Sequence, residues 1–296
     1  MPTPFGGSTP RRMLLQVCVN GARPVAQHPW LSADPSVVAV DAARAVDAGA
    51  QEVHLHPKDA EGLDSVAPDD VARWVRAVRA VCPDVPLGVT TGEWAELDVE
   101  RRVAAIEAWT ELPDFASVNW HEAGADAVAT ALHARGVAVE AGIWDGAGLD
   151  AWRRSTAPGA YRRVLIELPD DAAGEVRAHA QGLIAHVTRV KPGVPILLHG
   201  EDRSAWPAVD LAAAWHLDTR IGLEDCLTLP DGRTAIGNAA LVRAALARMR
   251  AGARGAGVRG PVPDASSKPH RPGLNAMRFR PATAPTTRRP TPARPR

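Results

Sequence analysis

The chain has 296 residues, of which 46% are hydrophobic, and its 34 lysines and arginines balance 34 aspartates and glutamates. This length allows one large domain or two small ones, and the hydrophobic content is sufficient for a buried core. The balanced charge gives no bias towards nucleic acid or an anionic membrane, so we expect neither as a partner of the folded part.

The order of apolar and amphipathic segments predicts alternating strands and helices. Residues 1–12 are rich in Pro and Gly without an apolar stretch, which predicts a flexible N-terminus. The predicted strands are Leu14–Val19, Glu52–His56, Leu87–Thr90, Phe115–Val118, Ala138–Ile143, Arg163–Glu167, Pro195–Leu198 and Arg220–Leu223. The predicted helices are Ser36–Ala48, Pro68–Ala80, Glu100–Trp109, Ala125–Ala134, Gly148–Arg154, Asp171–Arg189, Ser204–His216 and Asn238–Arg250.

Eight strand–helix units within residues 13–250 match the size of one TIM (β/α)8 barrel, and we predict this α/β fold. A doubly wound open sheet is the alternative. We rank it second because the turn after the first strand, Asn20-Gly21-Ala22-Arg23-Pro24, lacks the G-x-G-x-x-G pattern that binds dinucleotides.

The last segment, residues 251–296, changes to Pro, Gly, Ala, Thr and Arg, with Asp264 as its single acidic residue. This composition predicts a disordered tail. We interpret its positive charge as solvated, and the alternative is a docking segment for an anionic partner.

The cysteines Cys18, Cys82 and Cys226 are few, widely separated and set among apolar residues. This pattern favours packed thiols in a reducing compartment over a disulfide framework. No apolar run approaches the length that crosses a bilayer, so we expect a cytoplasmic protein without a membrane segment.

Polar residues follow nearly every predicted strand. The active site of a TIM barrel lies at the C-terminal ends of its strands, where buried imidazoles and carboxylates need partners or a metal. The residues at these ends are Asn20, His54, His56, Thr90, Thr91, Asn119, Glu140, Glu167, His199, Glu201, Glu224 and Asp225. Their convergence indicates a catalytic site.

The segment Glu52–His56 carries two alternating histidines, His54 and His56. Side chains repeat every second residue along a strand, so both imidazoles point to one face, as two ligands of one metal must. Glu224, in the acidic pair with Asp225, would lie at the same end of the barrel. Two neutral imidazoles and one carboxylate are a common ligand set for catalytic Zn²⁺.

Each of these residues also has a structural interpretation. A histidine pair at a strand end is sometimes a satisfied core pair, and Glu140 is as compatible with a structural role as with a functional one. Arg220 shares a strand face with Glu224, so the two could form an ion pair that closes the barrel. Thr91 and Gly92 are also compatible with an ordinary turn.

Three motifs together resemble the β-keto acid cleavage enzymes, the family typified by the 3-keto-5-aminohexanoate cleavage enzyme. They are H-L-H-P-K-D from His54, T-T-G from Thr90, and R-I-G-L-E-D-C-L from Arg220, followed by N-A-A-L-V from Asn238. The resemblance covers Leu14–Met249, and the chain is shorter than usual members.

The resemblance implies a zinc-dependent TIM barrel that acts as an acyltransferase. Such an enzyme condenses a β-keto acid with acetyl-CoA by Claisen and retro-Claisen acyl exchange to yield products of the acetoacetyl-CoA type. It also implies a homotetramer. By this resemblance His54, His56 and Glu224 bind zinc, while Asp225 is the base and Arg220 holds it.

The same resemblance assigns substrate contacts. Thr90 and Thr91 would contact polar groups of the substrate, Thr90 as part of the catalytic set, and Glu140 matches a glutamate of the family's fifth strand. Asn119, after the fourth strand, is a further substrate-binding candidate. Arg23 stands where members commonly have a glutamate, so we predict an anionic or neutral substrate tail rather than an amine.

Two further departures concern the loops. Glu122 replaces a usual threonine after the fourth strand, and Leu168-Pro169-Asp170-Asp171 replaces a glycine-rich loop that helps to form the substrate and CoA region. Two alternatives therefore stay open. One is a metal-dependent hydrolase with His199 as an additional site residue, and the other is a barrel that binds a metabolite without catalysis.

Overall fold

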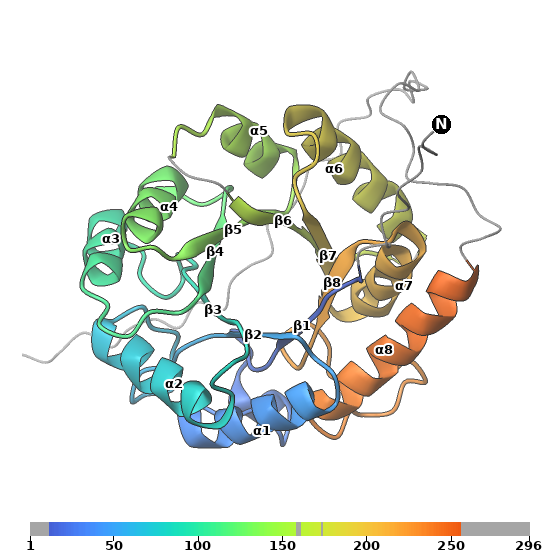
Figure 1. Ribbon diagram of the computed structural model, residues 1–296, viewed down its shortest axis with the longest axis horizontal. Coiled ribbons are helices and arrows are strands. Elements are labelled where there is room, and N and C mark those ends of the chain that lie inside the picture. The colour runs from blue at the N-terminus through green and yellow to red at the C-terminus, as the bar shows by residue number, and fades with distance from the viewer. Residues whose placement is uncertain (1–11, 158–160, 173, 256–296) are drawn as a thin grey trace, which may run out of the picture. The chain divides into compact units, whose positions relative to one another are not determined.

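The structure, a computed structural model, describes residues 12–157, 161–172 and 174–255. Eight parallel strands close into a barrel in chain order from β1 to β8, with β8 pairing back to β1, and the helices surround them (Figure 1). This confirms the predicted TIM barrel. The alternative of an open doubly wound sheet is wrong, because β1 and β8 are hydrogen-bonded to each other.

The elements have the following bounds. The strands are β1 (Leu15–Cys18), β2 (Glu52–Leu55), β3 (Leu87–Thr90), β4 (Phe115–Asn119), β5 (Ala138–Ile143), β6 (Tyr161–Leu168), β7 (Ile196–Gly200) and β8 (Asp218–Ile221). The helices are α1 (Pro35–Asp47), α2 (Pro68–Val81), α3 (Val99–Glu107), α4 (Ala125–Ala134), α5 (Gly146–Arg154), α6 (Val176–Val190), α7 (Ala205–Trp215) and α8 (Asn238–Gly255). Short 3₁₀ turns cover Val25–Gln27 and Asp202–Ser204.

The predicted boundaries differ from the observed ones mainly in two helices. Helix α6 begins at Val176 rather than Asp171, because Asp171 donates its backbone N–H to Ser204 Oγ and is held in the loop after β6. Helix α8 continues to Gly255, past the predicted end at Arg250. The predicted flexible N-terminus, residues 1–12, lies outside the described residues except for residue 12, and the predicted tail, residues 251–296, does so from residue 256. Residues 251–255 of that predicted tail belong to α8 instead.

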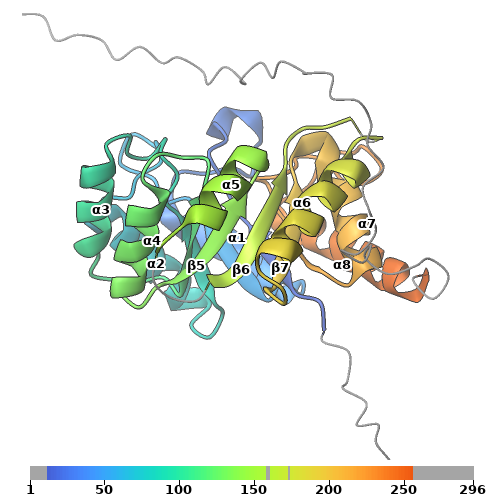
Figure 2. The same cartoon turned by 90° about the horizontal axis from the view of Figure 1, so that it is seen from above.

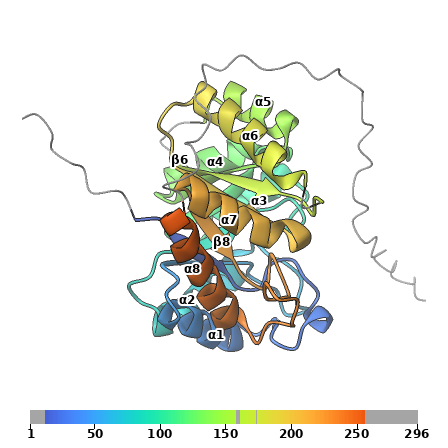
Figure 3. The same cartoon turned by 90° about the vertical axis from the view of Figure 1, so that its right-hand side faces the viewer.

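Aspartates cap the N-termini of several helices. Asp34, Asp98 and Asp145 each accept a backbone N–H in the first turn of α1, α3 and α5, which satisfies donors that have no partner inside the helix. On the outside, α5 packs against β5 and α6 against β6 (Figure 2), and α7 packs along α8 (Figure 3). No helix in the described part of the chain is long and apolar enough to span a membrane.

The barrel interior is polar, although TIM barrels are usually filled by branched apolar side chains. Near the N-terminal ends of the strands, the guanidinium of Arg163 forms ion pairs with Glu140, whose Oε1 lies 2.7 Å from Nε, and with Glu52. Gln16 Nε2 donates to Glu140 over 3.2 Å. These side chains are buried, so the ion pairs compensate charges that would otherwise be costly inside the protein.

The turn after β8 lies directly on the end of β1. A Cβ atom at Gly222 would overlap the backbone carbonyl of Cys18. A Cβ at Gly21, whose φ is +61°, would overlap the side chain of Glu224. Glycine at both positions therefore allows the two segments to approach closely.

We predict that Gly222→Ala lowers the free energy of unfolding by about 1–3 kcal/mol, because the new methyl group must displace backbone atoms. Gly182→Ala, in α6 with open space around the Cβ position, is the control and should raise it by about 0.5–1 kcal/mol. Urea unfolding of both variants measures the difference, and an unchanged stability of Gly222→Ala would contradict the close contact.

Candidate metal and catalytic site

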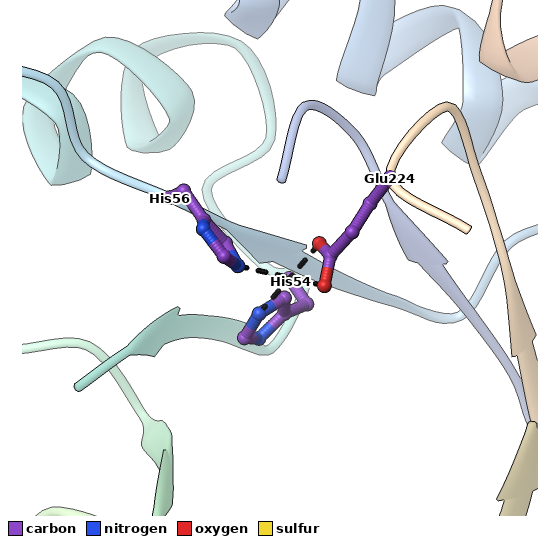
Figure 4. A group of neighbouring side chains, drawn as sticks. All are labelled: His54, His56 and Glu224. Carbon is purple, nitrogen blue, oxygen red and sulfur yellow. Dashed lines mark ion pairs between the residues drawn. The ribbon is translucent and has the colours of Figure 1, made fainter. Parts of the chain in front are cut away.

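Two strands on either side of β1 bring the predicted metal ligands together. His54 lies in β2 and His56 directly follows it, while Glu224 lies in the turn after β8. Figure 4 shows the carboxylate of Glu224 directed towards both imidazoles. The closed barrel makes these segments neighbours although about 170 residues separate them in sequence.

The three side chains form a compact group. Glu224 Oε1 is 3.4 Å from His56 Nε2, and Glu224 Oε2 is 3.8 Å from His54 Nε2. Their candidate ligand atoms all lie within 4.8 Å of one another. Both histidines are buried, and the side chain of Glu224 is 12% exposed.

The electrostatics of this group suit a cation. Burial lowers the pKa of His54 to about 3, which leaves a neutral imidazole with a free lone pair. Burial also acts to lower the pKa of His56, but Glu224 and Asp64 outweigh it and raise the pKa to about 9. Glu224 and Asp64 thus favour positive charge at His56, which a bound metal would supply in place of a proton.

Buried polar atoms without hydrogen-bond partners also indicate a cation site. Among the described residues, His54 Nδ1 and Glu224 Oε2 are buried without a hydrogen-bond partner. Buried polar atoms in native proteins are rarely left in this state. Two imidazoles and one carboxylate with free electron pairs therefore fit a divalent metal with an open coordination position.

Arg220 joins the candidate metal ligand to the candidate base. Its Nη2 donates to Glu224 Oε1 over 2.8 Å and to Asp225 Oδ1 over 3.2 Å. Burial acts to raise the pKa of Asp225, but Arg220 and His199 together outweigh burial and lower the pKa. Asp225 is therefore an ionised carboxylate at neutral pH. Cys18 donates its thiol to Asp225 Oδ2 over 2.7 Å.

A second polar group lies on the other side of Arg220. Arg220 Nε donates to His199 Nδ1 over 3.1 Å, and His199 Nε2 is 3.3 Å from Glu167 Oε2. The pKa of Glu201 is raised to about 8, because its carboxyl is buried and because Glu167 and Asp225 add negative charge nearby. The carboxyl of Glu201 thus keeps its proton at neutral pH.

The predicted substrate contacts on β3 and β4 already have protein partners. Thr90 Oγ1 accepts from Gly92 N over 3.2 Å, and Thr91 Oγ1 donates to the carbonyl of Ser117 over 2.7 Å. Asn119 donates to Glu122 Oε1 over 2.8 Å and accepts from Trp144 Nε1 over 3.2 Å. These contacts shape the β3 and β4 ends.

Two other residues that were predicted to contact the substrate lie apart from the side chains of the candidate metal ligands. Glu140 belongs to the ion pairs near the N-terminal ends of the strands. Arg23 uses its guanidinium to bind the carbonyl of Glu224 over 2.7 Å and the carboxylate of Asp202 over 2.6 Å. Arg23 therefore supports the backbone that presents Glu224.

The charged residues that replace the family's usual residues in two loops also have partners within this chain. Glu122 accepts from the buried guanidinium of Arg102 over 3.1 Å and from Glu93 N over 2.8 Å. Asp170 accepts from Arg203 Nε over 2.9 Å. The charges that replace the expected threonine and glycines are thus neutralised by arginines of this chain.

Sequence reasoning missed Asp64, Trp94 and the contact of Cys18 with Asp225. Asp64 and Trp94 lie in loops after β2 and β3, where no periodicity marks a buried or functional position. Cys18 did have a signal, because it alternates with Gln16 and Asn20 on the inner face of β1.

The sequence profile of the beta-keto acid cleavage enzyme family (BKACE) matches residues 12–256, which include the whole barrel and its three candidate ligands. The chain belongs to the beta-keto acid cleavage enzyme family. It is 23% identical over 246 residues to the 3-keto-5-aminohexanoate cleavage enzyme of Fusobacterium nucleatum, covering 78% of this chain and 89% of that enzyme.

Solved structures show the same fold at low sequence identity. This BKACE chain matches the apo structure of ObcA with a TM-score of 0.60 and 20% identity, over 77% of this chain and 63% of the ObcA chain. It matches a tryptophan synthase alpha chain of Legionella pneumophila with a TM-score of 0.52 and 14% identity, over 83% and 94% of the two chains. The chain thus spans less than two thirds of ObcA.

The raised pKa of Glu201 predicts a pH dependence of stability. The native carboxyl keeps a proton up to about pH 8, whereas an ordinary glutamate loses it near 4.5. Stability should therefore fall as the pH rises between these values and level off above them. Glu201→Gln, which cannot ionise, should show a smaller fall from about pH 5 to pH 8 in urea unfolding.

The control for this experiment is Glu107→Gln, which changes an exposed glutamate of α3. Its pH profile should follow that of the wild type. Equal slopes for the wild type and Glu201→Gln would show that Glu201 ionises normally in the native protein.

Proposed function

We propose that this protein is a zinc-dependent acyltransferase that exchanges acyl groups between a β-keto acid and acetyl-CoA. The observation that carries the proposal is the buried group of His54, His56 and Glu224 beside the ionised carboxylate of Asp225. Membership of the BKACE family supports the substrate class.

Bound Zn²⁺ would supply Lewis acid chemistry by stabilising negative charge that develops on a substrate oxygen. His54, His56 and Glu224 would hold it. Asp225 would accept a proton from the carbon between the ketone and the carboxylate of the β-keto acid. That carbon would then attack the thioester carbonyl of acetyl-CoA and release CoA thiolate. The thiolate would attack the original ketone, retro-Claisen cleavage would break the bond between the ketone carbon and the acetylated carbon, and the proton would return to that carbon, giving an acyl-CoA and acetoacetate.

The strength of Asp225 as a base depends on its neighbours. Arg220 keeps the carboxylate ionised but also makes it less basic, and the thiol of Cys18 donates to its second oxygen. Burial acts in the opposite direction and strengthens the base. Thr90, Thr91 and Asn119 would act mainly by shaping the walls against which the substrate lies, whereas Glu140 would stabilise the barrel interior through its ion pair with Arg163.

Relatives of the same fold are consistent with this substrate class. Structures of ObcA are described as a binary complex with oxaloacetate and a ternary complex with a C4-CoA adduct and oxalate. Oxaloacetate is a β-keto acid, so we propose similar chemistry here. A hydrolase of the barrel type, which uses further histidines, is less favoured, because His199 is bonded to Arg220 and lies outside the candidate metal group.

We predict that His54→Ala and Glu224→Ala lose both bound zinc and acetyl-CoA-dependent consumption of β-keto acids. Asp225→Asn should keep the zinc and lose activity by about 10²–10⁴-fold, the usual contribution of a general base. Elemental analysis and the assay are performed on the same purified samples, over a panel of β-keto acids.

The control is His186→Ala, which removes an exposed histidine of α6 and should keep both properties. Full zinc content in His54→Ala would contradict the metal site. Turnover of a β-keto acid without acetyl-CoA would favour hydrolysis, and a zinc-loaded protein without turnover on the whole panel would favour the binding protein.

We predict that Arg23→Glu lowers the preference for anionic over cationic β-keto acids by about fivefold, because a charge contact of about 1 kcal/mol is reversed. The readout is the ratio of kcat/KM for the two substrate classes. Asp202→Asn, which removes the partner of Arg23 and keeps its charge, should leave the ratio on the anionic side. An unchanged ratio in Arg23→Glu would contradict a role of Arg23 in substrate selection.

A further inference from the structure

The loop after β2 folds back so that a carboxylate reaches one of the candidate metal ligands. Lys58 and Asp64 form an antiparallel bridge, Ser65 N donates to the carbonyl of Pro57 over 2.9 Å, and Gly62 turns the chain at φ +81°. The bridge returns Asp64 to the side of His56, where Oδ2 lies 3.0 Å from His56 Nδ1.

This loop is anchored from outside as well. The carbonyl of Lys58 accepts from the indole of Trp74 over 2.9 Å and from the guanidinium of Arg73 over 2.6 Å. Both donors belong to α2, which packs against the barrel. The position of Asp64 is therefore determined before any ligand binds.

The carboxylate of Asp64 accepts from three side chains on different segments. His56 Nδ1 and Trp94 Nε1 both lie within hydrogen-bond distance of Oδ2, the latter at 2.6 Å, while Lys58 Nζ donates to Oδ1. The side chain of Asp64 is 5% exposed. Lys58 compensates its charge and also donates to the carbonyl of Gly21 over 2.6 Å.

Trp94 holds His56 from a second direction. Its ring is stacked on the imidazole with an interplanar angle of 18° and a centroid separation of 6.0 Å. Its other neighbour is Gly92, where a Cβ atom would overlap the indole. A carboxylate on Nδ1 and an aromatic ring over the face leave the imidazole one orientation, with Nε2 towards Glu224.

We propose that Asp64 is the positioning residue of the metal site: it keeps the proton of His56 on Nδ1 and directs Nε2 to the metal, and Trp94 holds Asp64 in place. This inference rests on the proposed zinc site. Hydrogen bonds from metal-bound histidines to carboxylates orient the ring and increase its basicity, and their loss typically weakens metal binding by about 10–100-fold.

The test measures the dissociation constant of Zn²⁺ for the full-length apo protein by competition with a chromophoric chelator. Asp64→Asn should bind Zn²⁺ about 10–100-fold more weakly than the wild type. Trp94→Phe keeps an aromatic ring and removes the N–H donor, so it should weaken binding by a smaller factor. The visible spectrum of bound Co²⁺ should change in Asp64→Asn, because His56 is no longer held in one orientation.

The matched control is Asp59→Asn in the same loop. Asp59 Oδ1 accepts from Glu61 N and Leu63 N without contacting His56, and an asparagine oxygen preserves those contacts. Its affinity for Zn²⁺ should equal that of the wild type. Unfolding of each apo variant shows that the fold is retained, and Trp94→Phe decides the question if Asp64→Asn does not fold.

The inference would be overturned if folded Asp64→Asn bound Zn²⁺ with an affinity within about twofold of the wild type. Loss of such a carboxylate partner typically weakens metal binding by about 10–100-fold. An equal loss in Asp59→Asn would overturn it too, since loop integrity would then be the cause. A wild-type protein that binds no Zn²⁺ would overturn the metal site together with this inference. Normal Zn²⁺ binding without acyl exchange would overturn the proposed reaction alone, and the affinities would still decide the role of Asp64.

Discussion

The arrangement of the site depends on the buried guanidinium of Arg220. It donates to Glu224, to Asp225 and to His199, all within 3.2 Å, and it is 3% exposed. Two adjacent carboxylates inside a barrel would repel each other and take up protons unless a cation lay between them. Arg220 helps to keep both ionised, so in the proposed function Glu224 would bind the metal while Asp225 would act as the base.

Backbone geometry makes this interaction possible. Glycine at positions 21 and 222 lets the turn after β8 lie against the end of β1, and Arg23 holds that turn through the carbonyl of Glu224. Near the opposite strand ends, Arg163 neutralises Glu52 and Glu140. The barrel thus contains alternating buried charges, and each arginine limits the desolvation penalty of the carboxylates around it.

Residues from both strands and loops position the side chains of the candidate metal site. The strands place His54, His56 and Arg220, whose positions follow from the pleat and the register. Asp64 and Trp94 come from loops and restrict the orientation of His56. Because loops after the strands vary while the barrel stays constant, this side of the site is where one family member can differ from another.

The sequence by itself determined the alternation of strands and helices and the barrel, and it identified His54, His56 and Glu224 as candidate metal ligands. These follow from periodicity, from the number of units and from residue type, which are local properties. Only the tertiary structure decided that Arg23 binds the Glu224 backbone and Asp202, that Glu140 belongs to a separate ion-pair group, and that Asp64 reaches His56. Hydrogen-bond partners of loop and interior side chains depend on how distant segments meet, and no local pattern encodes that meeting.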